Sequence, residues 1–228
     1  MDDGGMPRTS AETPVAAGEQ PGRPRLTKRG LATRNKLIAG ARQAFAERGY
    51  EMTRVADIAE AAGVSLGNVY RHFDDKDDVL LAVLRPLYAE LREATGRGAG
   101  REPVTSVDVL AQRNRLYLDF YTEHRALFRV SREAAASSSS ETFGQMWMQM
   151  RGSFIARNAA WLNGLVRAGR APGITAPEIM AEALGNMNEQ LAYTRIALAE
   201  TAPSQSEIDA MAETLARIWW RAIFGDGA

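Results

Sequence analysis

The sequence contains no cysteine, so disulfide bonds, thiolate metal sites and cysteine nucleophiles are excluded. Only two histidines occur, His72 and His124, and neither has a flanking motif of metal ligands. No apolar run approaches the roughly 20 residues of a membrane span, and residues 1–20 lack the apolar centre of a signal peptide. We therefore expect a cytoplasmic chain that needs no metal and no other cofactor.

Signatures of catalysis are also missing from the sequence. It has no glycine-rich phosphate loop and no nucleophile elbow. Its many carboxylates could supply acid or base groups, but none of them stands in a recognisable arrangement. We predict that the protein is not an enzyme, and we keep an enzyme or a carrier with an apolar cavity as an alternative.

The net charge of zero conceals an uneven distribution. Residues 21–48 contain eight lysines or arginines and one acid, whereas residues 176–228 contain three basic and eight acidic residues. Electrostatic partners respond to local fields and not to the total charge. The N-terminal part therefore favours a polyanion such as DNA, although a solvated basic tail on an ordinary domain has the same charge pattern.

The spacing of apolar residues predicts an all-α fold. Spacings of three and four recur along the chain, and no segment shows the alternation of a β-strand. Residues 1–24 are rich in Gly, Pro, Thr and Ala and lack apolar periodicity, which is typical of a disordered arm. We divide the chain into this arm, a helix-turn-helix head at residues 25–75 and a helical body at residues 76–228.

Capping signals give approximate limits for the helices. The first helix is expected at residues 33–49, followed by one with Thr53 as its N-cap and one with Ser65 as its N-cap. Asp74 or Asp75 should start the fourth helix. The later helices are expected at residues 106–123, 125–130 and 141–168 and after capping boxes formed by Thr175 with Glu178 and by Ser204 with Glu207.

Residues 53–73 have the features of a helix-turn-helix. Small Ala59 allows a close approach of helices, and Gly63 supplies the positive φ of the turn. Val69 and Phe73 should face inward, whereas the opposite side of that helix should face the DNA groove. A three-helix structural bundle could show the same spacing. The side expected in the groove carries Ser65, Leu66, Asn68 and Arg71.

The segment Gly63-Val64-Ser65, continued by residues 68–73 and Lys76, resembles the signature of TetR-family transcription regulators. The resemblance covers about residues 30–80. It implies base contacts from Ser65, Leu66, Gly67 and Asn68, and phosphate contacts from Thr53, Tyr70, His72 and Lys76. Independently, Lys76 stands at a helix start, where free amides favour a phosphate oxygen. The candidate DNA-binding set is completed by Arg71 and Arg34.

Polar residues stand among apolar ones in the C-terminal half. Most of the aromatic and methionine side chains there are expected in the core. A few converging polar groups in an apolar cavity are what ligand recognition requires, but satisfied core groups or an exposed helix face are equally compatible with the pattern. The polar residues in question are Asn158, Asn186, Asn188 and Glu189.

A second resemblance concerns residues 183–189 and Ile218-Trp219. Together with Trp147 and Phe154, these segments are similar to the mycobacterial regulators of ethionamide activation. The resemblance implies a long, mostly hydrophobic ligand channel. It departs at Gly185, where the relative has an asparagine, so the ligand is expected to differ. The residues expected along the channel are Trp147, Phe154, Asn158, Asn188, Tyr193 and Trp219.

Two apolar stripes in the last two helices predict a homodimer, because they offer more apolar surface than two helices can hide against one another. A two-fold dimer would also space two recognition helices for a palindromic operator in double-stranded DNA. We therefore predict a dimeric repressor that a small hydrophobic effector releases. A regulator without a ligand and an activator remain alternatives. The stripes are Met180, Leu184, Met187, Leu191 and Leu198, and Ile208, Met211, Leu215, Ile218, Ala222 and Ile223.

Overall fold

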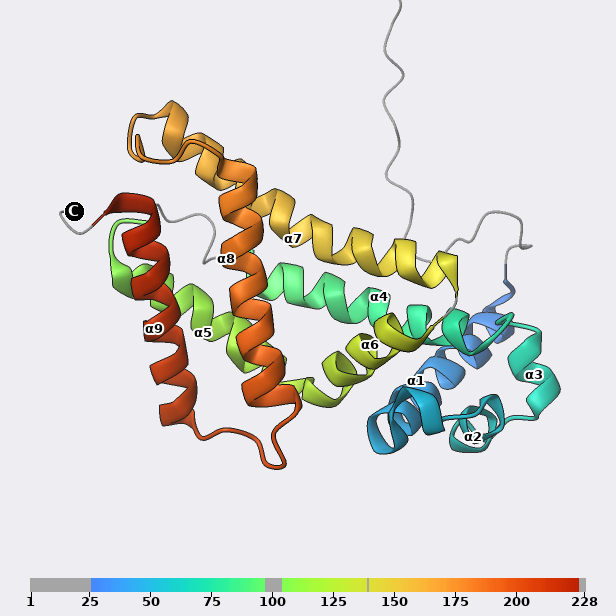
Figure 1. Cartoon of the computed structure of the whole chain (residues 1–228). Coiled ribbons are helices and arrows are strands. Elements are labelled where there is room, and N and C mark those ends of the chain that lie inside the picture. Colours follow the sequence, from blue (N-terminus) through green and yellow to red (C-terminus); the bar gives the residue numbers. More distant parts are fainter. Residues whose placement is uncertain (1–25, 97–103, 139, 226–228) are drawn as a thin grey trace, which may run out of the picture.

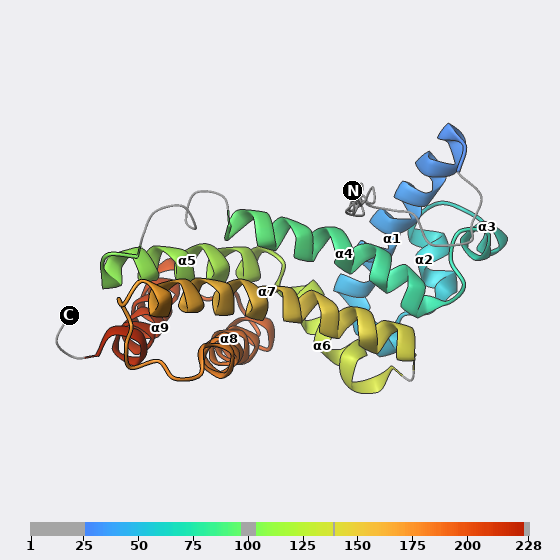
Figure 2. The ribbon, with the colours of Figure 1, turned by 90° about the horizontal axis from the view of Figure 1, so that it is seen from above.

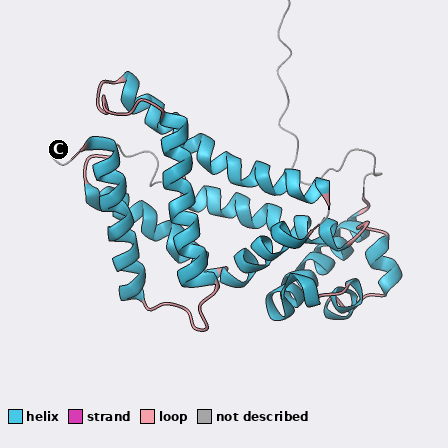
Figure 3. Ribbon diagram, viewed as in Figure 1, coloured by secondary structure: helices cyan, strands magenta, loops and turns pink. Residues whose placement is uncertain are grey.

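A computed structural model describes residues 26–96, 104–138 and 140–225. Within these ranges the chain forms nine α-helices and one π-helical turn, η1, with no β-strand (Figures 1 and 3), which confirms the all-α prediction. The predicted arm at residues 1–24 lies outside the described residues. The elements are α1 (Lys28–Met52), α2 (Val55–Ala61), α3 (Leu66–Tyr70), α4 (Lys76–Ala94), α5 (Val107–Glu123), α6 (Arg125–Ser137), α7 (Glu141–Arg167), α8 (Pro177–Ala192), η1 (Tyr193–Ala197) and α9 (Gln205–Phe224).

The first three helices form a head at one end of the molecule (Figure 2), and α4 leads from this head into the body. Leu37 and Phe45 of α1 are completely buried in the same core as Leu80 and Leu84 of α4. In the body, α5 packs along α9 and α8 packs along α7, while α6 packs against α1 of the head. The head and the body therefore share a continuous apolar core.

The start of α1 differs from the prediction. The helix begins at Lys28, five residues before Thr33, because the Thr27 hydroxyl accepts a hydrogen bond from the Gly30 amide and caps it there. The polar first turn has no apolar periodicity and so gave no signal. At the other end, Gly49 has a φ of 75° and interrupts the regular helix, as predicted.

Two later predictions were wrong. The N-cap of α8 is Ala176, without a side-chain hydrogen bond, so Thr175 forms no capping box. Helix α6 extends to Ser137, seven residues beyond the predicted 125–130, because Ser131 and Ala134 continue its buried side. By contrast, Ser204 and Glu207 form the predicted capping box at the start of α9.

Candidate DNA-binding head and ligand cavity

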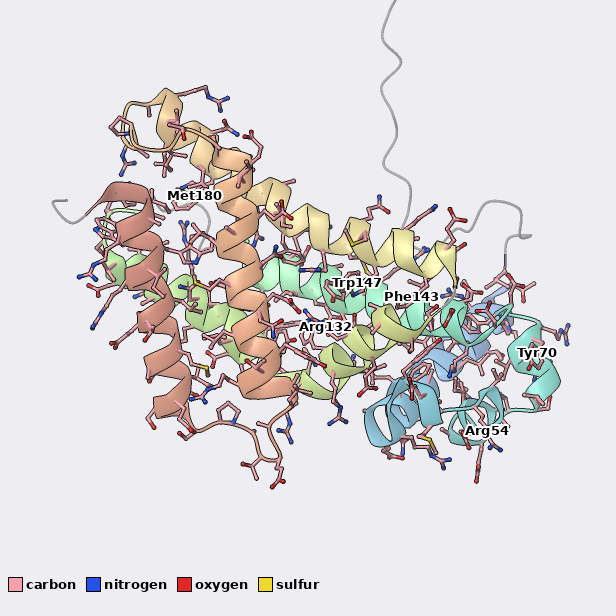
Figure 4. All side chains as sticks on the ribbon, viewed as in Figure 1. Arg54, Tyr70, Arg132, Phe143, Trp147 and Met180 are labelled. Atoms are coloured by element: carbon pink, nitrogen blue, oxygen red, sulfur yellow. The ribbon has the colours of Figure 1, made fainter. Side chains whose placement is uncertain are left out.

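The turn between α2 and α3 presents one side of α3 to the surface. Gly63 adopts a φ of 63°, and the Val64 amide donates to the Ala59 carbonyl oxygen over 3.0 Å. Val69 and Phe73 are buried, as predicted, and this fixes which side faces outward. Asn68 is half-buried at the edge of that side. The exposed residues of the predicted set are Ser65, Leu66, Gly67, Tyr70 and Arg71 (Tyr70 is labelled in Figure 4).

The chain leaves no room for a side chain at Gly40, a residue that the sequence analysis did not single out. A Cβ atom on Gly40 would lie 2.6 Å from the Ala62 amide nitrogen and 2.9 Å from the Ala61 carbonyl carbon. Both atoms belong to the backbone, which cannot move aside as a side chain can. Ala59 is buried as predicted, and Gly40 allows α1 to lie directly against the backbone at the end of α2.

Thr53 and Lys76, two residues predicted to contact phosphates, form hydrogen bonds with the C-terminal end of α1. Thr53 is 1% exposed, and its hydroxyl donates to the Gly49 carbonyl oxygen over 2.6 Å. It is also not the N-cap of α2, because Arg54 occupies that position. The Lys76 ammonium donates to the Tyr50 carbonyl oxygen over 2.9 Å and lies 4.0 Å above the Tyr50 ring. These side chains hold the head together, and their phosphate contacts stay predictions.

Replacing Lys76 by Ala distinguishes the two roles. If the ammonium also neutralises a phosphate, binding to all DNA sequences weakens alike and the slope of log K against log salt falls by about one unit. We expect this result, because Lys76 begins α4 and one hydrogen bond leaves two ammonium protons for a phosphate. Binding measured at several salt concentrations, with a melting curve as control, checks it. A lower melting temperature with an unchanged slope would leave only the structural role.

The remaining candidate residues of the head, Arg34 and His72, lie beside the C-terminal end of α3. The Arg34 guanidinium lies 5.1 Å from the centre of the Phe73 ring, so α1 carries a positive charge to the C-terminal end of α3. His72 is half-buried there. Within residues 26–96, 104–138 and 140–225 no group of three or more potential ligands forms a metal site.

A cavity of about 330 Å³ lies in the body, bordered by α4, α5, α7, α8, α9 and one side of α6. Phe154, Asn158, Asn188 and Trp219 line it, as expected. Trp147 and Tyr193 are not among its lining residues. Their rings are covered by Arg151, 4.7 Å from Trp147, and by Arg132, 4.5 Å from Tyr193 (Trp147 and Arg132 are labelled in Figure 4). The arginines thus stand where the sequence analysis expected these aromatic walls.

Asn188 and Trp219 belong to a chain of hydrogen bonds. Trp219 Nε1 donates to Asn188 Oδ1, and Asn188 Nδ2 donates to Asn114 Oδ1, each over 3.0 Å. Asn114 Nδ2 donates in turn to the Ala212 carbonyl oxygen over 3.5 Å. These hydrogen bonds join α8 to both α5 and α9. They thus connect the pair α5 and α9 to the pair α7 and α8. Asn114 could not be predicted, because an isolated asparagine in a helical sequence gives no signal of burial.

Glu189 lines the cavity, as the sequence suggested, but the arginines beside it were not expected. Arg132 binds Glu189 over 2.5 Å, and Arg151 lies 3.7 Å from the same carboxylate and donates to Asn186 Oδ1 over 2.8 Å. Arg113 and Arg157 also line the cavity. Arginine is rarely buried, so a sequence alone assigns it to the surface. The lining is therefore aromatic and cationic as well as apolar.

Three tyrosines add hydroxyl groups to the lining: Tyr88, Tyr117 and Tyr121. Burial raises the pKa of each phenol, which keeps all three protonated as hydrogen-bond donors. The Tyr88 hydroxyl lies 3.2 Å from the Ser131 hydroxyl. The Tyr121 hydroxyl is buried and has no hydrogen-bond partner in the part of the chain that the structure describes.

Comparisons with known proteins agree with this arrangement. The family model "Bacterial regulatory proteins, tetR family" matches residues 37–83, which contain the helix-turn-helix, and "Transcriptional regulator EthR, C-terminal domain" matches residues 112–225, half of the chain. The chain belongs to the TetR family. This TetR-family protein is therefore a DNA-binding transcription regulator, and the resemblance found in residues 63–76 is confirmed.

Relatives of this TetR-family protein are similar over different lengths. The transcriptional regulator EthR of Mycolicibacterium smegmatis is 26% identical over 95% of this chain and 96% of its own length. The repressor KstR2 of Rhodococcus jostii is 30% identical over 50% of this chain and 61% of its own. FadR of Bacillus subtilis, solved with stearoyl-CoA, has a TM-score of 0.68 and 16% identity over 84% of this chain and 98% of its own. The last likeness shows the fold alone.

In the described part of this TetR-family protein, no helix has the length and apolar character needed to cross a membrane.

Proposed function

We propose that the protein is a dimeric repressor that reads a palindromic operator with α3 and is released when a small molecule occupies the cavity. The observation that carries this proposal is the position of α6. Its Phe128 and Arg132 side chains line the cavity. From the same helix, the Glu133 carboxylate accepts a hydrogen bond from the Tyr50 amide of the head over 3.1 Å.

A second contact joins the start of α6 to the head. His124, the N-cap of α6, lies with its Nδ1 atom 3.0 Å from the Arg42 guanidinium of α1. A ligand that shifts α6 by pressing on Arg132 or Phe128 would therefore move a helix that contacts α1 at both Arg42 and Tyr50. Binding at the cavity and at the operator is then negatively coupled, provided that the ligand prefers the shifted position of α6.

Asn68 is proposed to read a base. Its amide can form two hydrogen bonds with adenine in the major groove. Asn68→Ala should change the preference among half-site variants by about 1–3 kcal/mol at one base pair and leave the other positions unaffected. Competition binding with single-base variants of the operator measures this. Tyr70→Phe is the control, because loss of a phosphate contact weakens all variants alike; the same uniform loss in Asn68→Ala would assign Asn68 to the phosphates.

The dimer is proposed to form through the exposed side of α8 and α9. The two apolar stripes of the sequence analysis are partly used within the chain, because Leu184, Ile208, Leu215 and Ile223 are buried in the protomer. Apolar side chains remain exposed near them, namely Ile179 at 70%, Leu198 at 52% and Ile218 at 43%. These exposed residues support a second copy as their cover.

Gel retardation with DNA from upstream of the protein's own gene tests the proposal. We expect retardation by two protomers per site, and release when decanol or decanoate is added. A protein that binds these compounds and retards no DNA would be the carrier or enzyme kept as the alternative. A complex that neither compound releases would contradict control through the cavity.

A further inference from the structure

Arginines outnumber carboxylates among the described residues that line the cavity. Four arginines line it, Arg113, Arg132, Arg151 and Arg157, and Glu189 is the one carboxylate among its described lining residues. Glu189 lies at the end near α6, where it binds Arg132 and Arg151. Arg157 lies at the other end of the cavity, against the C-terminal end of α4.

Arg157 is held by uncharged groups at this end. Its guanidinium donates to the Arg92 carbonyl oxygen over 3.3 Å and to the Thr95 hydroxyl over 3.1 Å. Burial, and after it repulsion from Arg113 and Arg92, lowers the pKa of Arg157. A guanidinium nevertheless stays charged at any pH that proteins tolerate. An anion in the cavity would offset both the cost of burying the Arg157 charge and its repulsion from Arg113 and Arg92.

The rest of the lining suits an apolar chain. Leu110, Asn114, Tyr117 and Tyr121 of α5 follow one another at helical spacing, so one side of α5 borders the cavity for about 16 Å. Phe154 and the stacked pair Trp161 and Trp219 face it from α7 and α9. A chain-like apolar group can therefore extend from the Arg157 end toward α6.

We propose that the effector is an amphiphile whose anionic oxygen head group, a carboxylate or a phosphate, binds Arg157 beside Arg113, while its apolar chain lies along α5. The fork of a guanidinium matches two oxygens of either head group. The proposal rests on the proposed function only in taking the cavity as the effector site. It replaces the purely apolar effector expected from the sequence, because the arginines could be located only in the folded chain.

Direct binding in the absence of DNA tests the head group. Calorimetry compares decanoate, decyl phosphate, decanol and decyltrimethylammonium, which share one chain length. We expect at least one of the two acids to bind about tenfold or more tightly than decanol, because charge-assisted hydrogen bonds exceed neutral ones. The cation should bind most weakly, and added salt should reduce only the affinity of the acids. The tighter of the two acids identifies the head group. Decanol binding as tightly as both acids would overturn the proposal.

Arg157→Gln locates the anion. It should reduce the preference for acid over alcohol to about twofold or less while decanol affinity stays near that of the parent. The matched control is Arg170→Gln, since Arg170 also donates to a carbonyl oxygen, that of Val104 over 3.1 Å, and is not among the cavity-lining residues. It should keep the full preference. If Arg157→Gln does not fold, Arg157→Lys keeps the charge and should retain a reduced preference for acids.

The assignment of Arg157 would be overturned if folded Arg157→Gln kept the parent's preference for acids. It would also be overturned if Arg157→Lys bound acids no more tightly than decanol. Because these measurements contain no DNA, their failure leaves operator reading intact. A protein that prefers acids but retards no operator DNA would contradict the proposed function and leave the assignment of Arg157 intact.

Discussion

Gly40→Ala is expected to destabilise the head by roughly 1–3 kcal/mol, which is the usual cost of forcing an extra carbon into a packed interior. The added Cβ would lie 2.6 Å from the Ala62 amide nitrogen, so α2 would have to move away from α1. Since α2 supports α3, the reading helix would move with it. Operator binding should then fall by about tenfold or more, as measured by gel retardation and compared with urea unfolding.

Gly164→Ala is the matched control for this prediction. Gly164 lies inside α7, and nothing stands within 4 Å of the position that its Cβ would take. The change should stabilise the protein by about 0.5–1 kcal/mol, since alanine is the better helix former. Operator affinity should stay unchanged. A Gly40→Ala protein with the parent's stability and operator affinity would show that the contact between α1 and α2 tolerates the extra carbon.

Asn188→Leu is expected to lower the free energy of unfolding by on the order of 3 kcal/mol. The change leaves Trp219 Nε1 without its acceptor and Asn114 Oδ1 without its donor, and a buried polar group left unpaired costs about 1–3 kcal/mol. For a chain of this size the midpoint of thermal unfolding should fall by roughly 6–12 °C. Calorimetry or circular dichroism measures the shift.

A surface asparagine provides the comparison for Asn188. Asn163 Nδ2 donates to an exposed carboxylate of Glu178 over 2.8 Å, so Asn163→Ala should change stability by less than about 0.5 kcal/mol. If Asn188→Leu were equally mild, the chain of hydrogen bonds from Trp219 to Asn114 would not contribute to stability. Asn188 would then be available to a ligand, which is the role that the resemblance in the sequence implied.

Helix starts illustrate how far local signals reach. The capping box at Ser204 and the N-cap at Asp75, one of the two predicted candidates, were readable because such caps bind an amide three residues away. Gly63 and Gly49 could be assigned to turns because glycine is the residue that favours a positive φ. Both adopt one in the structure. The start of α1 was missed since its first turn is polar and carries no apolar pattern.

The sequence by itself determined the helical class, the inward side of α3 with Val69 and Phe73, and the family, because these depend on spacings within a few residues and on one contiguous motif. Only the tertiary structure decided the contact at Gly40 and the charges of the cavity. Gly40 meets Ala62, and Arg157 meets Arg92, across long stretches of chain. Whether a side chain is buried, and beside which charge, depends on how distant helices pack, and no local pattern records that arrangement.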